Sequence, residues 1–257
     1  MSAPTVVLVH GIRASRTMWL RQLAALDAAG VPAVAPDLPG HGVRAGEDFS
    51  VAGALDTIES VVAGIEGPFV VAGLSLGGYL TLHWAARTTR RPEALLAASC
   101  TTQPRGPGLS VYRRLAALIA RLPDGGAGLN DLMARRFLPE PARADLAAGG
   151  MTMSVMSAAL EGMAQVDALA DVARIDVPIW FVNGRWDHFR GHERRFLAAA
   201  RQGRLVVVPG ATHLVSLVRP VAFNRVLLDL VDEVASDRAD AVTGPADHVP
   251  VPAGPRP

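Results

Sequence analysis

The sequence contains no lysine, and all 25 of its basic residues are arginine. Together with 24 acidic residues they give a formal net charge of +1, so the chain lacks the strong excess of one charge that attracts nucleic acids. Arginine doublets such as Arg113-Arg114 are typical of solvated helix faces. We therefore expect no nucleic-acid partner.

Cysteine and long apolar runs are scarce as well. The single Cys100 cannot form an internal disulfide, which is typical of a reducing compartment. The chain begins almost directly with a strand-like segment instead of a signal peptide, and no apolar run is long enough to cross a bilayer. We expect a cytoplasmic protein that does not associate with membranes, and the oligomeric state is left open.

A recognisable metal-binding pattern is also missing. His188 and His192 are four residues apart and could bracket a metal on a helix, but no His-Glu-x-x-His motif surrounds them. We expect no metal and no organic cofactor.

Half of the residues are hydrophobic, and they form short apolar runs that alternate with segments of helical periodicity. The predicted strands are residues 6–9, 31–35, 69–72, 95–98, 179–182 and 205–208. The predicted core helices are residues 17–29, 50–65, 76–88, 191–201 and 219–234. This alternation predicts an α/β fold with a doubly wound, mostly parallel six-stranded sheet, whose active residues lie beyond the carboxyl ends of the strands.

One long interval interrupts the alternation. Residues 102–165 carry helical segments around 111–122, 129–137 and 141–162 without a strand between them, which predicts a helical cap. The α/β core is then residues 1–101 and 166–235. Residues 236–257 hold five of the 19 prolines and little apolar material, so we expect a disordered tail there.

The segment Gly73-Leu74-Ser75-Leu76-Gly77 lies where the third strand ends and a helix begins, and it matches the G-x-S-x-G nucleophile elbow. Such a turn is so tight that it strains the serine backbone and requires glycine two residues away on either side. The strain exposes the Ser75 hydroxyl at the edge of the sheet. The pattern also occurs by chance as a plain small-residue turn, but here it falls at the predicted strand-to-helix junction.

A serine nucleophile needs a base, and the base needs a carboxylate to orient it. His213 follows the last strand on a glycine-containing loop, whereas His83 lies in the middle of a helix and His41 in a turn. Asp187 follows the penultimate strand, and the chain order Ser75, Asp187, His213 is the order this architecture requires.

Three other carboxylates are weaker candidates for the acid. Asp171 and Asp176 precede the penultimate strand and would lie at its wrong end. Asp37 is the nearest rival, although it is typical of a structural turn residue.

The motifs VLVHG, DLPGHG, GLSLGG, NGRWD and PGATH, in this order, resemble the α/β-hydrolase superfamily, in its serine-nucleophile esterase and lipase-like branch. The resemblance covers residues 5 to about 235 and implies that the backbone N–H groups of Ile12 and Leu76 form an oxyanion hole. His10 and Gly11 open that loop and are expected beside the substrate, with His10 hydrogen-bonded in the loop instead of acting as a base. Many relatives carry two further strands before VLVHG, so the sheet here is a minimal version with the strand at Val31 at its edge.

The predicted cap holds five of the seven methionines, which serve either as core between cap and sheet or as an adaptable apolar pocket lining. We expect Met133, Met153 and Met156 to contact substrate, together with His188 beside the predicted acid. The predicted activity is cleavage of a small to medium hydrophobic carboxylic ester or lactone through an acyl-enzyme. Thioester hydrolysis, carbon–carbon bond hydrolysis and cofactor-free perhydrolysis on the same residues stay open, as does a ligand receptor without turnover.

Overall fold

The computed structural model describes residues 3–119 and 121–243, and these contain one six-stranded sheet with the order β2-β1-β3-β4-β5-β6. All neighbouring strands are parallel. The strands are β1 (Thr5–Val9), β2 (Ala33–Val34), β3 (Phe69–Leu74), β4 (Ala94–Ala98), β5 (Ile179–Gly184) and β6 (Gly203–Val208). The predicted α/β class and the six parallel strands are confirmed.

The edge strand β2 is shorter than the sequence predicts. Residues 31–35 form a strand only at Ala33–Val34, where they pair with β1. Pro32 and Pro36 flank this pair and have no N–H to donate, which limits the ladder to two residues. As expected, this strand lies at the edge of the sheet.

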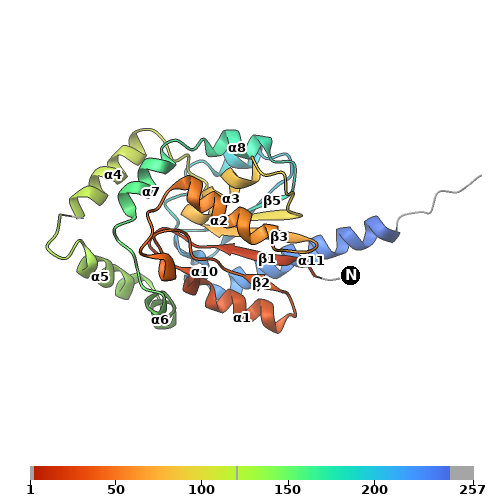
Figure 1. The fold of residues 1–257 in the computed structure, drawn as a ribbon, viewed down its shortest axis with the longest axis horizontal. Helices are drawn as coiled ribbons and strands as arrows, with labels where there is room; N and C mark the ends of the chain where they lie inside the picture. Colours follow the sequence, from red (N-terminus) through yellow and green to blue (C-terminus); the bar gives the residue numbers. More distant parts are fainter. Residues whose placement is uncertain (1–2, 120, 244–257) are drawn as a thin grey trace, which may run out of the picture.

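Helices cover both faces of the sheet (Figure 1). They are α1 (Leu20–Ala28), α2 (Val51–Ala63), α3 (Leu76–Ala85), α8 (Ala168–Arg174), α9 (Glu193–Ala199), α10 (Val215–Val218) and α11 (Pro220–Thr243), with short 3-10 turns η1 (Arg16–Trp19) and η2 (Gly42–Arg44). Alternate strand residues point to opposite faces, so Val7 and Val71 pack with α2, α3, α8 and α9, whereas Val6 and Val70 pack with α1 and α11. Two buried cores thus fix the sheet from both sides.

Between β4 and α8 the chain forms four helices, which we call the helical insertion (residues 102–165). They are α4 (Pro107–Ile119), α5 (Ala127–Phe137), α6 (Glu140–Ala148) and α7 (Met156–Met163), grouped at one end of the molecule (Figure 1). The single helix predicted over 141–162 is wrong, because the chain breaks at Gly149 and Gly150. Gly150 has φ +73°, and a Cβ on Gly149 would lie 1.9 Å from the Ser15 hydroxyl oxygen.

The expected tail from residue 236 is wrong for its first eight residues, because α11 continues to Thr243. One ion pair ties this extension to the sheet domain: Arg238 pairs with Glu93, just before β4, at 2.5 Å. Glu233, which precedes the extension, pairs with Arg204 at 3.0 Å. The last turns of α11 project from the end opposite the helical insertion (Figure 1). Residues 244–257 lie outside the described residues.

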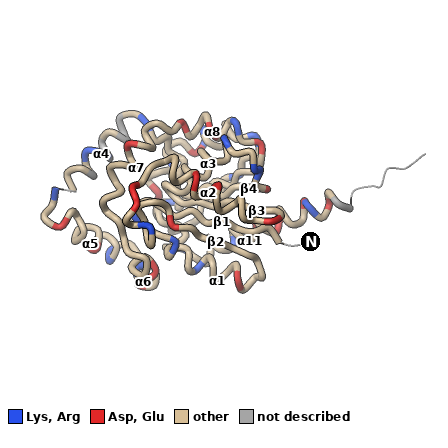
Figure 2. Tube along the Cα trace, viewed as in Figure 1, with Lys and Arg blue, Asp and Glu red and all other residues tan. Residues whose placement is uncertain are grey.

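Acidic and basic residues are interspersed along the outer helices (Figure 2). Within the described ranges, no helix combines the length and the hydropathy needed to cross a membrane.

We expect the packing of α11 to be essential for stability. Phe223 is fully buried with its ring 5.9 Å from that of Trp19, so Phe223→Ala should lower the free energy of unfolding by about 3–5 kcal/mol. Val221 on the same helix is 76% exposed, and Val221→Ala should change stability little. Urea titrations of both variants test this, and equal stabilities would contradict the described packing.

Candidate active site

Ser75 lies directly between β3 and α3, with φ +56° and ψ −117°. This is the strained backbone that the nucleophile-elbow motif predicts, in a region that L-residues rarely adopt. The residue is 8% exposed, and its N–H donates to Ala98 O at 2.8 Å. The turn is therefore anchored to the neighbouring strand β4 while its hydroxyl faces the carboxyl edge of the sheet.

Close backbone contacts explain the glycines around Ser75. A Cβ on Gly73 would lie 2.3 Å from Gly77 O, and a Cβ on Gly77 would lie 2.1 Å from Val9 O. Gly78 is restricted by the Cys100 Sγ, 2.7 Å from the position of its Cβ. Only glycine lets α3 start this close to β1, β3 and the segment after β4.

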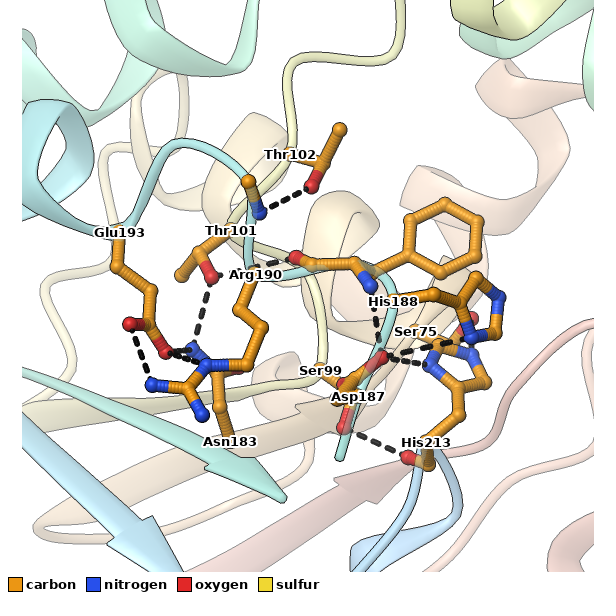
Figure 3. Close-up of polar contacts among 12 residues, drawn as sticks. Ser75, Ser99, Thr101, Thr102, Asn183, Asp187, His188, Arg190, Glu193 and His213 are labelled. Carbon is orange, nitrogen blue, oxygen red and sulfur yellow. Dashed lines mark hydrogen bonds and ion pairs between the residues drawn. The ribbon is translucent and has the colours of Figure 1, made fainter. Parts of the chain in front are cut away.

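The structure brings Ser75, His213 and Asp187 together at this edge (Figure 3). His213 Nε2 lies 2.9 Å from Ser75 Oγ, and His213 Nδ1 lies 2.9 Å from Asp187 Oδ1. With Nδ1–H donating to the carboxylate, Nε2 is free to accept the hydroxyl proton. This geometry equips a serine hydroxyl with a base and the base with an orienting acid.

The Asp187 carboxylate is buried but ionised. Burial acts to raise its pKa, yet the hydrogen bond and charge of His213 and the Phe189 N–H outweigh it and hold the pKa below its usual range. The Phe189 N–H donates to the same Oδ1 at 2.8 Å. The carboxylate is therefore charged at neutral pH and stabilises a positive imidazole.

Ser99 is a site residue that the sequence analysis missed. It follows β4 with φ +54°, is fully buried, and lies between the His213 carbonyl and Asp187. Its hydroxyl hydrogen points to His213 O, at 2.6 Å, and so fixes the backbone that carries the imidazole. A polar residue directly after a buried parallel strand is the signal that could have revealed it.

A second polar network holds the loop after β5 that carries Asp187 (Figure 3). Buried Asn183 donates to Thr101 Oγ1 and Glu193 Oε1, each at 2.8 Å. Arg190 holds the same Glu193 through two contacts, at 2.7 and 2.8 Å. Asn183 interrupts an otherwise apolar strand, and that interruption was the available sequence signal.

The N–H groups expected to form the oxyanion hole have no hydrogen-bond partner within residues 3–119 and 121–243. Leu76 starts α3, where the helix dipole favours negative charge. A Cβ on Gly11 would lie 3.7 Å from Ser75 Cβ, so the loop that continues to Ile12 passes beside the nucleophile. Both N–H groups are thus available donors.

The expectation that His10 contacts substrate is wrong. The ring is fully buried, its Nδ1 bonds Gly11 O at 2.9 Å, and its Nε2 accepts from Leu38 N at 3.0 Å. Burial, followed by the charge of neighbouring His41, lowers the pKa of His10 to about 4. His10 therefore stabilises the loop as a neutral ring, as does buried His41, whose Nε2 accepts from Arg13 N at 3.3 Å.

His188 lies at the rim of the site, with its side chain 67% exposed and its ring 5.0 Å from that of His213. Partial loss of solvation against the neighbouring rings, followed by the charge of His213, lowers the pKa of His188. Asp187, His188 and His213 are the one potential metal-ligand cluster in the described chain, with ligand atoms within 4.8 Å of one another. Asp187 and His213 already bond each other, so a metal would have to displace that contact. His188 and His192 precede α9, so they do not share a helix.

The predicted substrate methionines lie in different environments. Met133 is 49% exposed on α5, whereas Met153 and Met156 are half-buried. Met163 is buried in the hydrophobic core, which is the first of the two roles suggested for the methionines, packing between the cap and the sheet. Substrate contact by Met133, Met153 and Met156 stays a prediction.

The rival acids have structural partners elsewhere. Asp37 accepts from the N–H groups of Arg16 and Val43, at 2.7 and 3.0 Å, and closes the turn after β2. Asp171 bonds His83 at 2.7 Å, as well as Arg87, between α8 and α3.

Comparisons with known proteins agree with this geometry. Residues 6–226 match the sequence profile of the Alpha/beta hydrolase family. The chain is similar to a pimeloyl-(acyl-carrier protein) methyl ester esterase of Neisseria meningitidis, with 30% identity over 255 residues, 89% of this chain and 94% of the relative.

Solved structures show the same fold. One is a thermophilic esterase from Thermogutta terrifontis, with a TM-score of 0.72, 24% identity and 91% of each chain covered. Another is the enol-lactonase from Burkholderia xenovorans, with a TM-score of 0.74, 22% identity and coverage of 90% of this chain and 92% of the other.

Crowding at the elbow predicts a severe effect of one methyl group. Gly77→Ala should prevent folding or cost several kcal/mol, because its Cβ cannot fit 2.1 Å from Val9 O. Gly64 ends α2 at φ −84°, and its nearest Cβ contact would be 3.6 Å, so Gly64→Ala should be tolerated. Soluble yield and thermal unfolding compare the two, and a stable Gly77→Ala protein would contradict the described turn.

Buried neutral histidine predicts acid sensitivity. Because the pKa of His10 is about 4 in the folded state and ordinarily 6.5, the unfolded chain binds an extra proton between these values. Stability should then be complete above pH 6.5 and fall as the pH drops to 4, by about 3 kcal/mol. Lowered by burial, the pKa of His41 adds in the same direction. Urea unfolding at several pH values tests this; His10→Gln should flatten the slope, and an equally steep slope in that variant would refute it.

Proposed function

This chain belongs to the alpha/beta hydrolase family, and on that premise we propose that it is a serine esterase that forms an acyl-enzyme on Ser75. The observation that carries the proposal is the pair of 2.9 Å contacts from His213, one to Ser75 Oγ and one to Asp187 Oδ1. A hydroxyl, a base and an acid in this relation are the requirements for nucleophilic attack on a carbonyl.

In the first half-reaction, Ser75 Oγ attacks the ester carbonyl carbon as His213 Nε2 takes the hydroxyl proton. The resulting oxyanion accepts hydrogen bonds from the N–H groups of Ile12 and Leu76, each lowering the barrier by on the order of 3 kcal/mol. Collapse of the intermediate breaks the bond to the alcohol oxygen, which takes the proton from His213. Asp187 stabilises the imidazolium throughout.

In the second half-reaction, His213 removes a proton from water, and the hydroxide attacks the acyl carbon of the Ser75 ester. Collapse returns the proton to Ser75 Oγ and releases the carboxylic acid. All proton transfers use side chains of this chain, and we therefore propose that the reaction needs neither metal nor organic cofactor.

We assign substrate covering to the helical insertion, acting as a cap. Its half-buried Met153 and Met156 support a small to medium hydrophobic ester or lactone, because flexible thioethers adapt to varied apolar shapes. The esterase named among the relatives acts on a methyl ester, which supports small-alkyl esters as substrates here. Cys100 is a free thiol, and a chain that uses no disulfide supports the proposed cytoplasmic location.

Loss of the nucleophile should abolish turnover. Ser75→Ala should lower kcat on p-nitrophenyl acetate roughly a million-fold, and Asp187→Asn roughly 10,000-fold. Ser157→Ala, an exposed serine on α7, serves as the control. The wild type and this control should react with a fluorophosphonate probe, and Ser75→Ala should not.

An unlabelled and inert wild-type protein would contradict the esterase proposal and favour a receptor. Near-native activity in Ser75→Ala would require another nucleophile.

A further inference from the structure

Arg13 is a half-buried arginine in the loop between β1 and η1, directly after Ile12. Its backbone has φ +65°, one of three positive values at non-glycine residues in the described chain. Hydrogen bonds hold the backbone on both sides: its N–H donates to His41 Nε2 at 3.3 Å, and its carbonyl accepts from Thr152 N at 3.0 Å. The backbone of Arg13 is therefore fixed between the turn of His41 and the helical insertion.

The Arg13 guanidinium lies between this loop and the helical insertion. Nη1 donates to Asn130 Oδ1 on α5 at 3.2 Å and contacts the Met153 sulfur at 3.8 Å. The sulfur of Met151 in turn accepts from Asn130 Nδ2 at 3.3 Å. The cation therefore touches the Asn130 amide and the Met153 thioether, which are both neutral groups.

One whole edge of the guanidinium is unused. Arg13 Nε is buried and has no hydrogen-bond partner, and Nη2 has none among the described residues. No described carboxylate lies within ion-pair distance of Arg13, although Arg16, three residues later, pairs with Asp37. A buried donor left without an acceptor is costly, and for a charged group the cost is larger.

Arg13 lies on the same loop as the residues that pass beside the Ser75 nucleophile. Arg13 is two residues beyond Gly11, whose added Cβ would lie 3.7 Å from Ser75 Cβ. It also directly follows Ile12, the proposed oxyanion donor. A substrate between the loop and the helical insertion would have its ester at Ser75 and another part near Arg13.

We propose that the Nε–Nη2 edge of Arg13 binds a carboxylate on the substrate, so that the preferred ester is an anion with an otherwise apolar body. This inference rests on the proposed esterase function and specifies its substrate class. A guanidinium edge offers two parallel N–H donors that match the two oxygens of a carboxylate. The neutral amide and thioether in contact with the guanidinium supply no negative charge of their own, so an anionic ligand meets no competing carboxylate there.

The experiment compares esters with and without a free carboxylate, using initial rates counted per ester bond. Monomethyl glutarate and monomethyl adipate carry the carboxylate on the acyl side, and their dimethyl esters are the neutral counterparts. The acetyl ester of 4-hydroxybutanoate, beside butyl acetate, places the anion on the alcohol side. Methanol or acetate release gives the ratio of kcat/KM for anionic over neutral ester within each protein.

Arg13 is expected to bind a carboxylate on either the acyl or the alcohol part of the ester. For that part, the wild-type ratio of kcat/KM for anionic over neutral ester should exceed one. Arg13→Gln should lower this ratio about 10- to 100-fold, the range for a charge-assisted hydrogen-bond pair. Arg13→Lys keeps the charge but not the two-donor edge, so its ratio should lie between the two. Arg136→Gln is the control: Arg136 is an exposed arginine on α5, the helix that carries Asn130, and its loss should leave the ratio unchanged. An equal ratio in wild type and Arg13→Gln on both sides would overturn the proposal.

A binding measurement separates this proposal from the esterase proposal. Calorimetry of glutarate and 4-hydroxybutanoate with Ser75→Ala, and with Ser75→Ala/Arg13→Gln, needs no turnover. If the wild type hydrolyses none of these esters while binding of the acids depends on Arg13, the anion site is supported and the esterase proposal is overturned. Turnover of neutral esters combined with Arg13-independent binding of both acids would overturn the anion site and leave the esterase intact.

Discussion

The left-handed backbone of Ser75 is the constraint on which the rest of the site depends. Two parallel strands and a helix start meet within van der Waals distance around it, and glycine at positions 73 and 77 is what allows this approach. The Ser75 N–H bonds Ala98 O, so the strain is balanced by the sheet itself. Because the turn is rigid, Ser75 Oγ has a fixed position, and the loops after β5 and β6 only have to bring Asp187 and His213 to it.

Backbone strain recurs at the edge of the sheet where function is proposed. Arg13, Ser75 and Ser99 are the non-glycine residues with positive φ in the described chain, and each follows a strand of the central sheet. Ser99 fixes the His213 carbonyl, as the Asn183 network fixes the loop of Asp187. The segments after β1, β3 and β4 thus each contain a residue with positive φ, a backbone conformation that isolated peptides avoid and that the strands hold in place.

Much of this arrangement was predictable because it depends on local chemistry. The G-x-S-x-G pattern specifies the turn at Ser75, and residues placed after parallel strands meet at one edge, which brought Asp187 and His213 into the prediction. Ser50 also caps α2 as its sequence position predicts, accepting from Gly53 N at 3.0 Å. These features are encoded within a few residues.

What escaped prediction depends on contacts between distant segments. At Gly149 the backbone passes so close to Ser15, more than 130 positions away, that a Cβ would lie 1.9 Å from its hydroxyl oxygen, and Arg238 in the extension of α11 pairs with Glu93. Composition suggested that residues 236–243 would be irregular, but the helix continues through them and Arg238 pairs with Glu93 before β4, a contact that composition does not reveal. The expected hydrogen bonding of His10 in the loop is confirmed, but its substrate contact was wrong, because the ring is fully buried and its Nε2 accepts from Leu38 N, 28 residues later.

The loop after β1 combines two proposed tasks, oxyanion stabilisation and carboxylate binding, in three consecutive residues. Gly11 permits close approach to Ser75, Ile12 presents its N–H to the oxyanion, and Arg13 presents its guanidinium to a carboxylate. The N–H and carbonyl groups of Arg13 are bonded to His41 and Thr152, so the orientation of Ile12 is tied to contacts on both the core and the helical insertion. If the substrate carboxylate occupies the free edge of Arg13, binding at one end of the ester stabilises the segment that holds the oxyanion donor at the other. Recognition and transition-state stabilisation would then share one rigid element, which is how binding energy remote from the reacting bond can be used to lower the barrier.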